Sequence, residues 1–161
     1  MTNLKKMLYS ILVVVSTAFL CSYFTGFGIN GWYHDIEKTP LTPPDSVFPV
    51  VWSILYMMMA GAFYLVLKSS GHKEYKIANT FFLSQLLLQI IWCFLFFYNG
   101  FIGLAFGIIL LLDFFVWKTM LLFRKINQTA YYLLLPYFIW ICFASVLNFS
   151  FIVSQGLIVV F

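Results

Sequence analysis

Five apolar runs of about 20 residues, separated by short polar breaks, fill almost all of this chain. A helix of about 20 residues, rising about 1.5 Å per residue, crosses a hydrocarbon core of roughly 30 Å. The alternation over about ten residues that a transmembrane strand needs is not seen. The sequence therefore predicts an all-α fold, in which residues 1–161 form one integral membrane bundle of five transmembrane helices. The expected spans are Leu8–Phe27, Ser46–Leu67, Ile77–Phe97, Phe101–Phe123 and Ala130–Ser154.

Composition excludes a water-soluble globule. Of the 161 residues, 63% are hydrophobic and 9% are charged, whereas about a quarter of a soluble domain is charged. Lys5 and Lys6 before the first apolar run imitate a signal peptide, but that run has no small-x-small cleavage site before Gly26. We therefore expect an uncleaved anchor and five helices.

Basic residues divide unevenly between the breaks. Lys38 is alone on one side of the expected bundle, and the other side holds Lys5, Lys6, Lys68, Lys73, Lys76, Arg124 and Lys125. By the positive-inside rule, the N-terminus should be cytoplasmic, with the Trp32–Pro44 loop and the C-terminus outside. The net charge of +4 thus reflects topology, and no nucleic acid partner is expected. The uncharged tail 156–161 should prolong the last helix or lie in the interface.

The three cysteines, Cys21, Cys93 and Cys142, all fall inside apolar spans. A thiol there is usually a small buried hydrophobe, and an odd number does not make a disulfide framework. Their spacing does not fit a metal site, and His34 in the first loop is read as solvated. We expect no metal and no resident cofactor.

The segment that joins the first two spans is the most distinctive stretch. It holds four of the five prolines, Pro40, Pro43, Pro44 and Pro49. Proline fixes φ and lacks an N–H, so the part before Asp45 should be a stiffened, extended loop. With Ser46 as the N-cap, Pro49 falls in the first helical turn, where no intrahelical bond is lost.

Aromatic and amide residues recur at helical spacing on three spans. Phe48, Trp52 and Tyr56 share one helix face, and so do Gln85, Gln89 and Trp92 on span three; Trp140, Ala144 and Asn148 repeat at four on span five. Buried amides need partners, so the glutamine face should look into the bundle, as interhelical contacts or as ligand contacts. From the helical rise, these groups overlap in depth and predict an outer-half pocket for a flat hydrophobic ligand. An aromatic belt explains the interfacial tryptophans equally well, although Trp140 lies near the midplane.

Three features of the remaining spans concern helix packing or proton coupling. Gly103 and Gly107 form a G-x-x-x-G typical of helix contact or dimerisation. Span one carries small residues that favour close helix packing, namely Ser16, Thr17, Ser22, Thr25, Gly26 and Gly28. Asp113 lies near the middle of span four, with Lys118 about 140° round the helix. The carboxyl group should therefore be protonated, paired elsewhere or hydrated, and it is a functional candidate.

As a set, these residues resemble the family of tryptophan-rich sensory proteins that includes the mitochondrial translocator (peripheral benzodiazepine receptor) protein. The resemblance covers nearly the whole chain and rests on Trp32-Tyr33, Lys38, Pro43-Pro44, Phe48, Val51-Trp52, Leu55-Tyr56, Gln85-Leu86, Trp92 and the run from Pro136 to Asn148. It implies five packed helices, a homodimer, and a pocket beneath the first loop for porphyrins and synthetic isoquinoline or benzodiazepine ligands.

The resemblance also implies which residues serve this site. The ligand-binding set would be Tyr33, Trp52, Tyr56, Gln89, Trp92, Trp140, Phe143, Ala144 and Asn148. It further implies a light- and oxygen-dependent breakdown of bound porphyrin, in which Trp52 and Trp140 are oxidised or pass an electron. Three departures stand out: Leu41 replaces the loop's usual tryptophan, Gln89 replaces an asparagine, and Phe149 breaks the sterol-associated pattern, so a sterol role is unsupported.

The leading hypothesis is a membrane receptor or sensor-like protein for tetrapyrroles, with porphyrin as a ligand and not as a cofactor. A transporter that uses Asp113 for proton coupling is the alternative, although five spans without a visible inverted repeat count against it. A purely structural partner protein is the third hypothesis.

Overall fold

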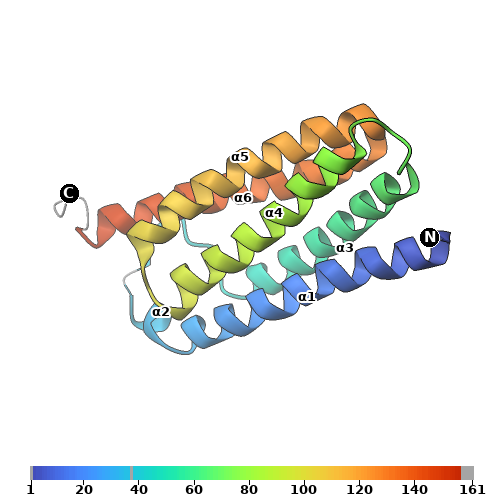
Figure 1. Ribbon diagram of the computed structural model, residues 1–161. Coiled ribbons are helices and arrows are strands. Elements are labelled where there is room, and N and C mark those ends of the chain that lie inside the picture. The colour runs from blue at the N-terminus through green and yellow to red at the C-terminus, as the bar shows by residue number, and fades with distance from the viewer. Residues whose placement is uncertain (1, 37, 157–161) are drawn as a thin grey trace.

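The computed structural model describes residues 2–36 and 38–156, and it contains no strand among them. Five long helices follow one another (Figure 1): α1 Asn3–Ile29, α3 Val47–Lys68, α4 Tyr75–Cys93, α5 Ile102–Ile126 and α6 Gln128–Ser154. A short helix α2, Trp32–Asp35, follows α1, and a π-helical turn η1, Phe94–Tyr98, prolongs α4. All five are long and apolar enough to cross a membrane. The all-α, five-span prediction is confirmed.

The helix ends follow local capping chemistry. α1 begins five residues before its predicted start, because the Thr2 side chain accepts a hydrogen bond from the Lys5 N–H. Asn127 caps α6 in the same way through the Ala130 N–H, at 3.0 Å. Ser46 does precede α3, and Pro49 does lie in its first turn, although the Ser46 hydroxyl makes no capping bond.

The prediction of an extended loop from Trp32 to Pro44 is wrong for its first four residues. These form α2, which ends where the Ile36 N–H donates to the Trp32 carbonyl. Among the described residues 36 and 38–46 of the loop there is no further helix. At the other end of the chain, α6 stops at Ser154, and the predicted fate of the tail concerns 157–161, which lie outside the described residues.

The helices form a closed ring. α1 packs against α3 and α4, α3 also packs against α6, and α5 lies between α4 and α6. The N-terminus, the α3–α4 connection and the α5–α6 connection lie at one end of the bundle, which we call the basic end (Figure 1). α2 and residues 38–46 lie at the opposite end, which we call the loop end.

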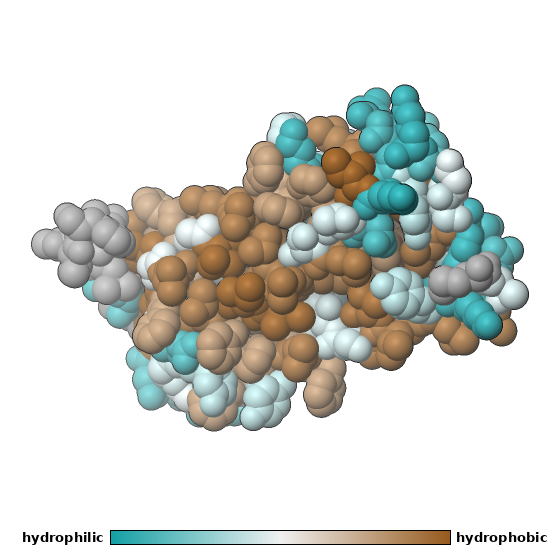
Figure 2. Space-filling model, in the orientation of Figure 1, coloured by the Kyte–Doolittle hydropathy of each residue, from teal (hydrophilic) through white to brown (hydrophobic). Residues whose placement is uncertain are grey.

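Surface chemistry agrees with a membrane-spanning bundle. Hydrophobic residues cover its middle, and hydrophilic residues gather most densely at the basic end (Figure 2). Lys125 lies 3.8 Å from Glu74 there, and Lys6 donates to Ser70. The protein is a multi-pass integral membrane protein, and most of its basic residues lie at one end, with Lys38 at the other.

Candidate functional site

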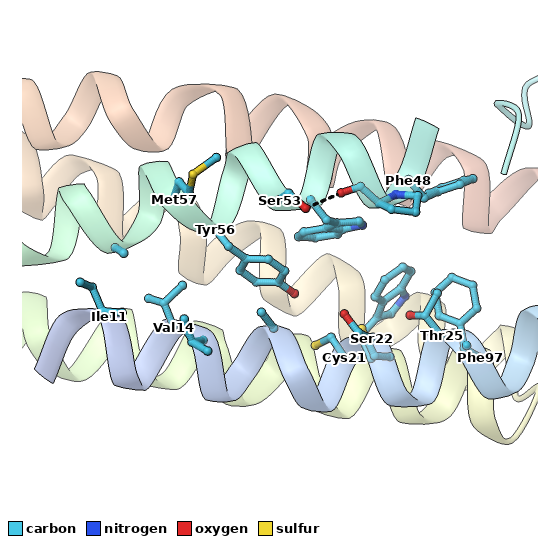
Figure 3. Close-up of a pocket in the computed structure, with 18 of the residues that line it drawn as sticks. Ile11, Val14, Cys21, Ser22, Thr25, Phe48, Ser53, Tyr56, Met57 and Phe97 are labelled. Atoms are coloured by element: carbon cyan, nitrogen blue, oxygen red, sulfur yellow. Dashed lines mark hydrogen bonds between the residues drawn. The ribbon is translucent and has the colours of Figure 1, made fainter. Parts of the chain in front are cut away.

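A large cavity lies between α1 and α3, and we call it the α1–α3 cavity (Figure 3). Its volume is about 930 Å³. Side chains from both helices point into it from opposite sides, and α4 and η1 close its back. The wall is mainly apolar, with a few polar groups from Ser22, Thr25, Ser53 and Tyr56.

A second, much smaller cavity lies deeper in the loop end, and we call it the aromatic cavity. Its volume is about 30 Å³, which is about the space of one water molecule. Seven of the nine predicted ligand-binding residues surround it: Tyr33, Trp52, Trp92, Trp140, Phe143, Ala144 and Asn148. The structure therefore brings these residues together, but around a nearly filled space.

The two cavities share part of their walls. Thr25, Phe48, Trp52, Trp92 and Phe97 line both. Trp140 lines the aromatic cavity but not the α1–α3 cavity. Its ring meets that of Phe48 edge-on, with ring centroids 6.1 Å apart. Trp52 therefore borders the larger cavity, whereas Trp140 contacts Phe48 and does not border it.

Hydrogen bonds fix the tryptophan of α4. The Trp92 Nε1–H donates to Asn148 Oδ1 at 3.2 Å, and Asn148 Nδ2 donates to the Ile102 carbonyl at 3.0 Å. Trp92 also stacks on Phe96, with ring centroids 5.5 Å apart. Because Asn148 is fully buried, its two bonds prevent an unsatisfied amide and hold the indole in one orientation.

Gln89 lies among these residues but lines neither cavity. Its Nε2 donates to the Tyr56 hydroxyl at 2.8 Å, and its Oε1 accepts from the Tyr137 hydroxyl at 3.1 Å. Tyr56 in turn stacks on Trp52, with centroids 5.3 Å apart. Gln89 is thus an interhelical link between α3, α4 and α6, and it positions Tyr56 at the wall of the α1–α3 cavity.

The loop end is closed by contacts of Lys38 and Thr39. Lys38 Nζ lies 2.8 Å from Asp45 and 4.9 Å from the centroid of the buried Tyr33 ring. The Thr39 hydroxyl lies 3.0 Å from that of Ser150 on α6. Burial, and secondarily the charge of Asp45, raises the pKa of Tyr33 to about 12, so the phenol stays protonated.

Trp32 ties α2 to the end of α4. Its Nε1–H donates to the Phe97 carbonyl at 2.8 Å. This carbonyl lies in the last turn of the helix, where no backbone N–H of the helix itself can donate to it. Its ring lies against Gly100, whose φ of +69° suits glycine. The π-helical turn that presents Phe97 is a feature that often marks functional sites.

Asp113 lies away from both cavities. Its Oδ2 accepts a hydrogen bond of 2.7 Å from the Ser145 hydroxyl on α6. Lys118 is not its partner, since Lys118 Nζ lies 4.8 Å from the Trp117 ring centroid. The Ser145 hydroxyl is thus a hydrogen-bond partner of this carboxyl group on another helix, and its protonation and hydration stay predictions.

Sequence reasoning missed the contribution of α1. Ser22, Thr25 and Gly26 were assigned to close helix packing, whereas all three line the α1–α3 cavity. Their spacing placed them on one face, but that face meets an empty space. Close packing occurs one turn later, where Gly28 lies directly against the backbone of Phe97.

Comparisons with known proteins cover most of the chain. The model of the TspO/MBR family matches residues 10–153. A tryptophan-rich protein TspO of Archaeoglobus fulgidus is 36% identical over 150 residues, covering 92% of this chain and 95% of that protein. The translocator protein of Ovis aries is 33% identical (79% of this chain, 76% of that protein), and the tryptophan-rich sensory protein of Cereibacter sphaeroides is 32% identical (74% and 73%).

Proposed function

The chain belongs to the TspO/MBR family of membrane sensory and translocator proteins, and from that premise we propose that it is a receptor or sensor-like protein for porphyrins and related flat hydrophobic molecules. The ligand would occupy the α1–α3 cavity with one face against Trp52. Synthetic aromatic ligands of similar shape would use the same wall.

The observation that carries this proposal is the size and lining of the α1–α3 cavity. Its volume of about 930 Å³ lies within the range of about 300–1,000 Å³ typical of small-molecule sites. Trp52, stacked on Tyr56, offers a flat aromatic surface at that wall. Such a surface suits a planar conjugated ring, and a few hydroxyl groups remain to orient it.

The aromatic cavity is too small for a macrocycle in the observed arrangement. A porphyrin would reach Trp140 only after Phe48, which lines both cavities, moves aside. Light- and oxygen-dependent breakdown of the bound ring would therefore involve Trp52 directly and Trp140 through this displacement. This ordering of the two tryptophans is part of the proposal.

Two further parts of the proposal concern assembly and orientation. The G-x-x-x-G face of α5 is open, since a Cβ at Gly103 or Gly107 would meet no atom within 4 Å, and this supports a homodimer through α5. The gathering of basic residues at one end supports a cytoplasmic N-terminus, with the loop end outside. A proton-coupled transporter is less supported, because Asp113 lines neither cavity.

The test is a titration of the purified protein with protoporphyrin, followed by tryptophan quenching in the dark and then under light. Trp52→Phe should weaken binding about two- to tenfold, the factor that corresponds to a stacking contribution of about 0.5–1.5 kcal/mol. Trp140→Phe should weaken it less. Trp117→Phe, at an exposed position on α5, is the matched control and should leave affinity unchanged.

Three results would each contradict a part of the proposal. Protoporphyrin binding that is absent in the unaltered protein would remove the receptor function. Equal loss of affinity in the Trp52 and Trp117 variants would remove the assigned binding surface. Undiminished photodegradation in a Trp52→Phe/Trp140→Phe double variant would remove the tryptophan mechanism while leaving binding intact.

A further inference from the structure

The α1–α3 cavity extends well beyond the proposed porphyrin surface. Tyr64, which lines the cavity towards the basic end, lies about 18 Å further along α3 than Trp52, from a rise of about 1.5 Å per residue. Figure 3 shows Ile11 and Val14 pointing from α1 towards α3 across this part of the cavity. We call it the basic half, and it is lined by Met7, Ile11, Val15, Met57, Gly61 and Tyr64.

The basic half opens sideways between α1 and α3. Val15 on α1 is 57% exposed and Met57 on α3 is 67% exposed, although both also line the cavity. Both residues lie within membrane spans, where the surrounding medium is hydrocarbon. Lipid acyl chains therefore enter this apolar groove from the bilayer. Because all phospholipids have such chains, selection of one lipid must come from groups at the end of the groove.

Two lysines lie at that end. Lys68 Nζ lies 5.6 Å from the centroid of the Tyr64 ring. Lys6, which precedes Met7 in α1, donates to the Ser70 hydroxyl at 3.5 Å and so links the start of α1 to the end of α3. Neither lysine is buried, and their long aliphatic stems let the ammonium groups reach the headgroup layer. Since Ser70 accepts in this bond, its own O–H can donate to a further oxygen.

The charges at this end favour an anionic headgroup. Among the described residues at the basic end, the acidic side chain is that of Glu74, and its carboxylate lies 3.8 Å from Lys125. The salt bridges in the described part of the chain involve neither Lys6 nor Lys68. A zwitterionic headgroup would bring a cation that finds no unpaired carboxylate here, whereas a headgroup with a net negative charge meets two ammonium groups.

We propose that the basic half of the α1–α3 cavity binds one anionic glycerophospholipid, with its phosphate at Lys6 and Lys68 and one acyl chain along the groove. The Ser70 hydroxyl donates to a phosphate oxygen. The proposal is independent of the porphyrin site, because it concerns the opposite end of the cavity and a lipid of the surrounding membrane.

The experiment titrates the full chain in detergent micelles with phosphatidylglycerol or with phosphatidylcholine of the same acyl chains, and native mass spectrometry counts the bound lipids. One phosphatidylglycerol should bind more tightly than phosphatidylcholine. Lys6→Gln and Lys68→Gln should each weaken its binding about fivefold, the factor for one lysine near an anionic headgroup. The double variant should lose the preference for phosphatidylglycerol.

A control pair carries the same change in net charge. Lys76→Gln/Arg124→Gln removes two positive charges from α4 and α5 at the same end, at residues that do not line the cavity, and should leave the lipid affinity unchanged. Equal affinity for the two lipids, or equal losses in the two double variants, would overturn the proposal. Displacement of phosphatidylglycerol by inorganic phosphate would also overturn it, since the site would then bind a free anion.

A second comparison tests the acyl chain. Ile11→Trp places an indole in the groove and should weaken binding of both lipids, while Lys6 and Lys68 remain in place. Leu12→Trp is the matched control, because Leu12 is 65% exposed and does not line the cavity. Equal lipid affinities in the two tryptophan variants would show that the acyl chain does not lie in the groove and would overturn the proposal.

Discussion

Helices α1 and α6 are equally long, at 27 residues each, yet α1 has five buried residues and α6 has ten. The buried residues of α1 are small or polar: Ser10, Val14, Thr17, Cys21 and Gly28. Those of α6 include the fully buried Leu134, Tyr137, Ile141 and Phe151. Both helices are apolar, but α1 forms a hollow interface with α3 on one side of the ring. On the other side, α6 forms a dense interface with α5.

The physical reason lies in how helices associate in lipid. Lipid tails are as apolar as leucine, so burial of apolar area contributes little, and close packing and interhelical hydrogen bonds decide the association. α1 has two such contacts: the Ser10 hydroxyl donates to the Ala60 carbonyl at 2.6 Å, and Gly28 lies on Phe97. The cavity opens along the rest of its α3 side. A ligand that binds on the hollow side therefore displaces few contacts between helices.

The largest expected effect is on the dense side. Leu112 on α5 is fully buried, and Leu112→Ala should lower the free energy of unfolding by about 2–5 kcal/mol, because it leaves a void. The neighbouring Leu111 is 42% exposed, so Leu111→Ala should lower the free energy of unfolding much less. Denaturant titration in mixed micelles measures both. Equal losses would mean that Leu112 is not packed inside the bundle on the dense side.

A smaller effect is expected where α1 is held at the loop end. Gly28→Ala adds a Cβ that overlaps the Phe97 carbonyl, and this should lower the free energy of unfolding by about 1–3 kcal/mol. Gly26→Ala, half a turn away, meets no atom within 4 Å and is the control. The same titration measures the pair of variants. A Gly28 variant as stable as the Gly26 variant would show that α1 is not fixed at this point.

The contact near the basic end should contribute less. Ser10→Ala removes the bond to the Ala60 carbonyl and should lower the free energy of unfolding by about 0.5–1.5 kcal/mol. Ser16→Ala, at an exposed position of the same helix, is the control. Hydrogen exchange of the α1 amides should rise in the Ser10 variant alone. Unchanged exchange would place the restraint of α1 elsewhere.

The smallest effect concerns pH at the loop end. The pKa of Tyr33 is raised from 10.0 to about 12, so the folded protein holds this proton more tightly than the unfolded chain. The contribution of the protonated Tyr33 to the stability of the folded protein is therefore fully present below pH 10, and it is lost as the pH rises towards 12. Thermal stability of the unaltered protein and of Tyr33→Phe should run parallel up to pH 10 and diverge above it. Divergence near pH 7 would show that Tyr33 is not shielded from water.

Much of the architecture was predictable from sequence because it depends on local patterns. Run length and hydropathy defined the five spans, and charge placement grouped the basic residues at one end. Helical spacing also placed Trp92 and Asn148 on inward faces, and the structure joins them by a hydrogen bond of 3.2 Å. These properties follow from the periodicity of single helices, which depends only on residues close together in the sequence.

The tertiary structure decided how far apart these faces lie. It made Gln89 a link between tyrosines, closed the space around Trp140 behind Phe48, and opened a cavity against Ser22 and Thr25 on α1. Distances between helices depend on where small residues such as Gly28 allow backbones to touch and on the side chains that hold them apart elsewhere. That balance involves residues far apart in the chain, so no local pattern in the sequence contains it.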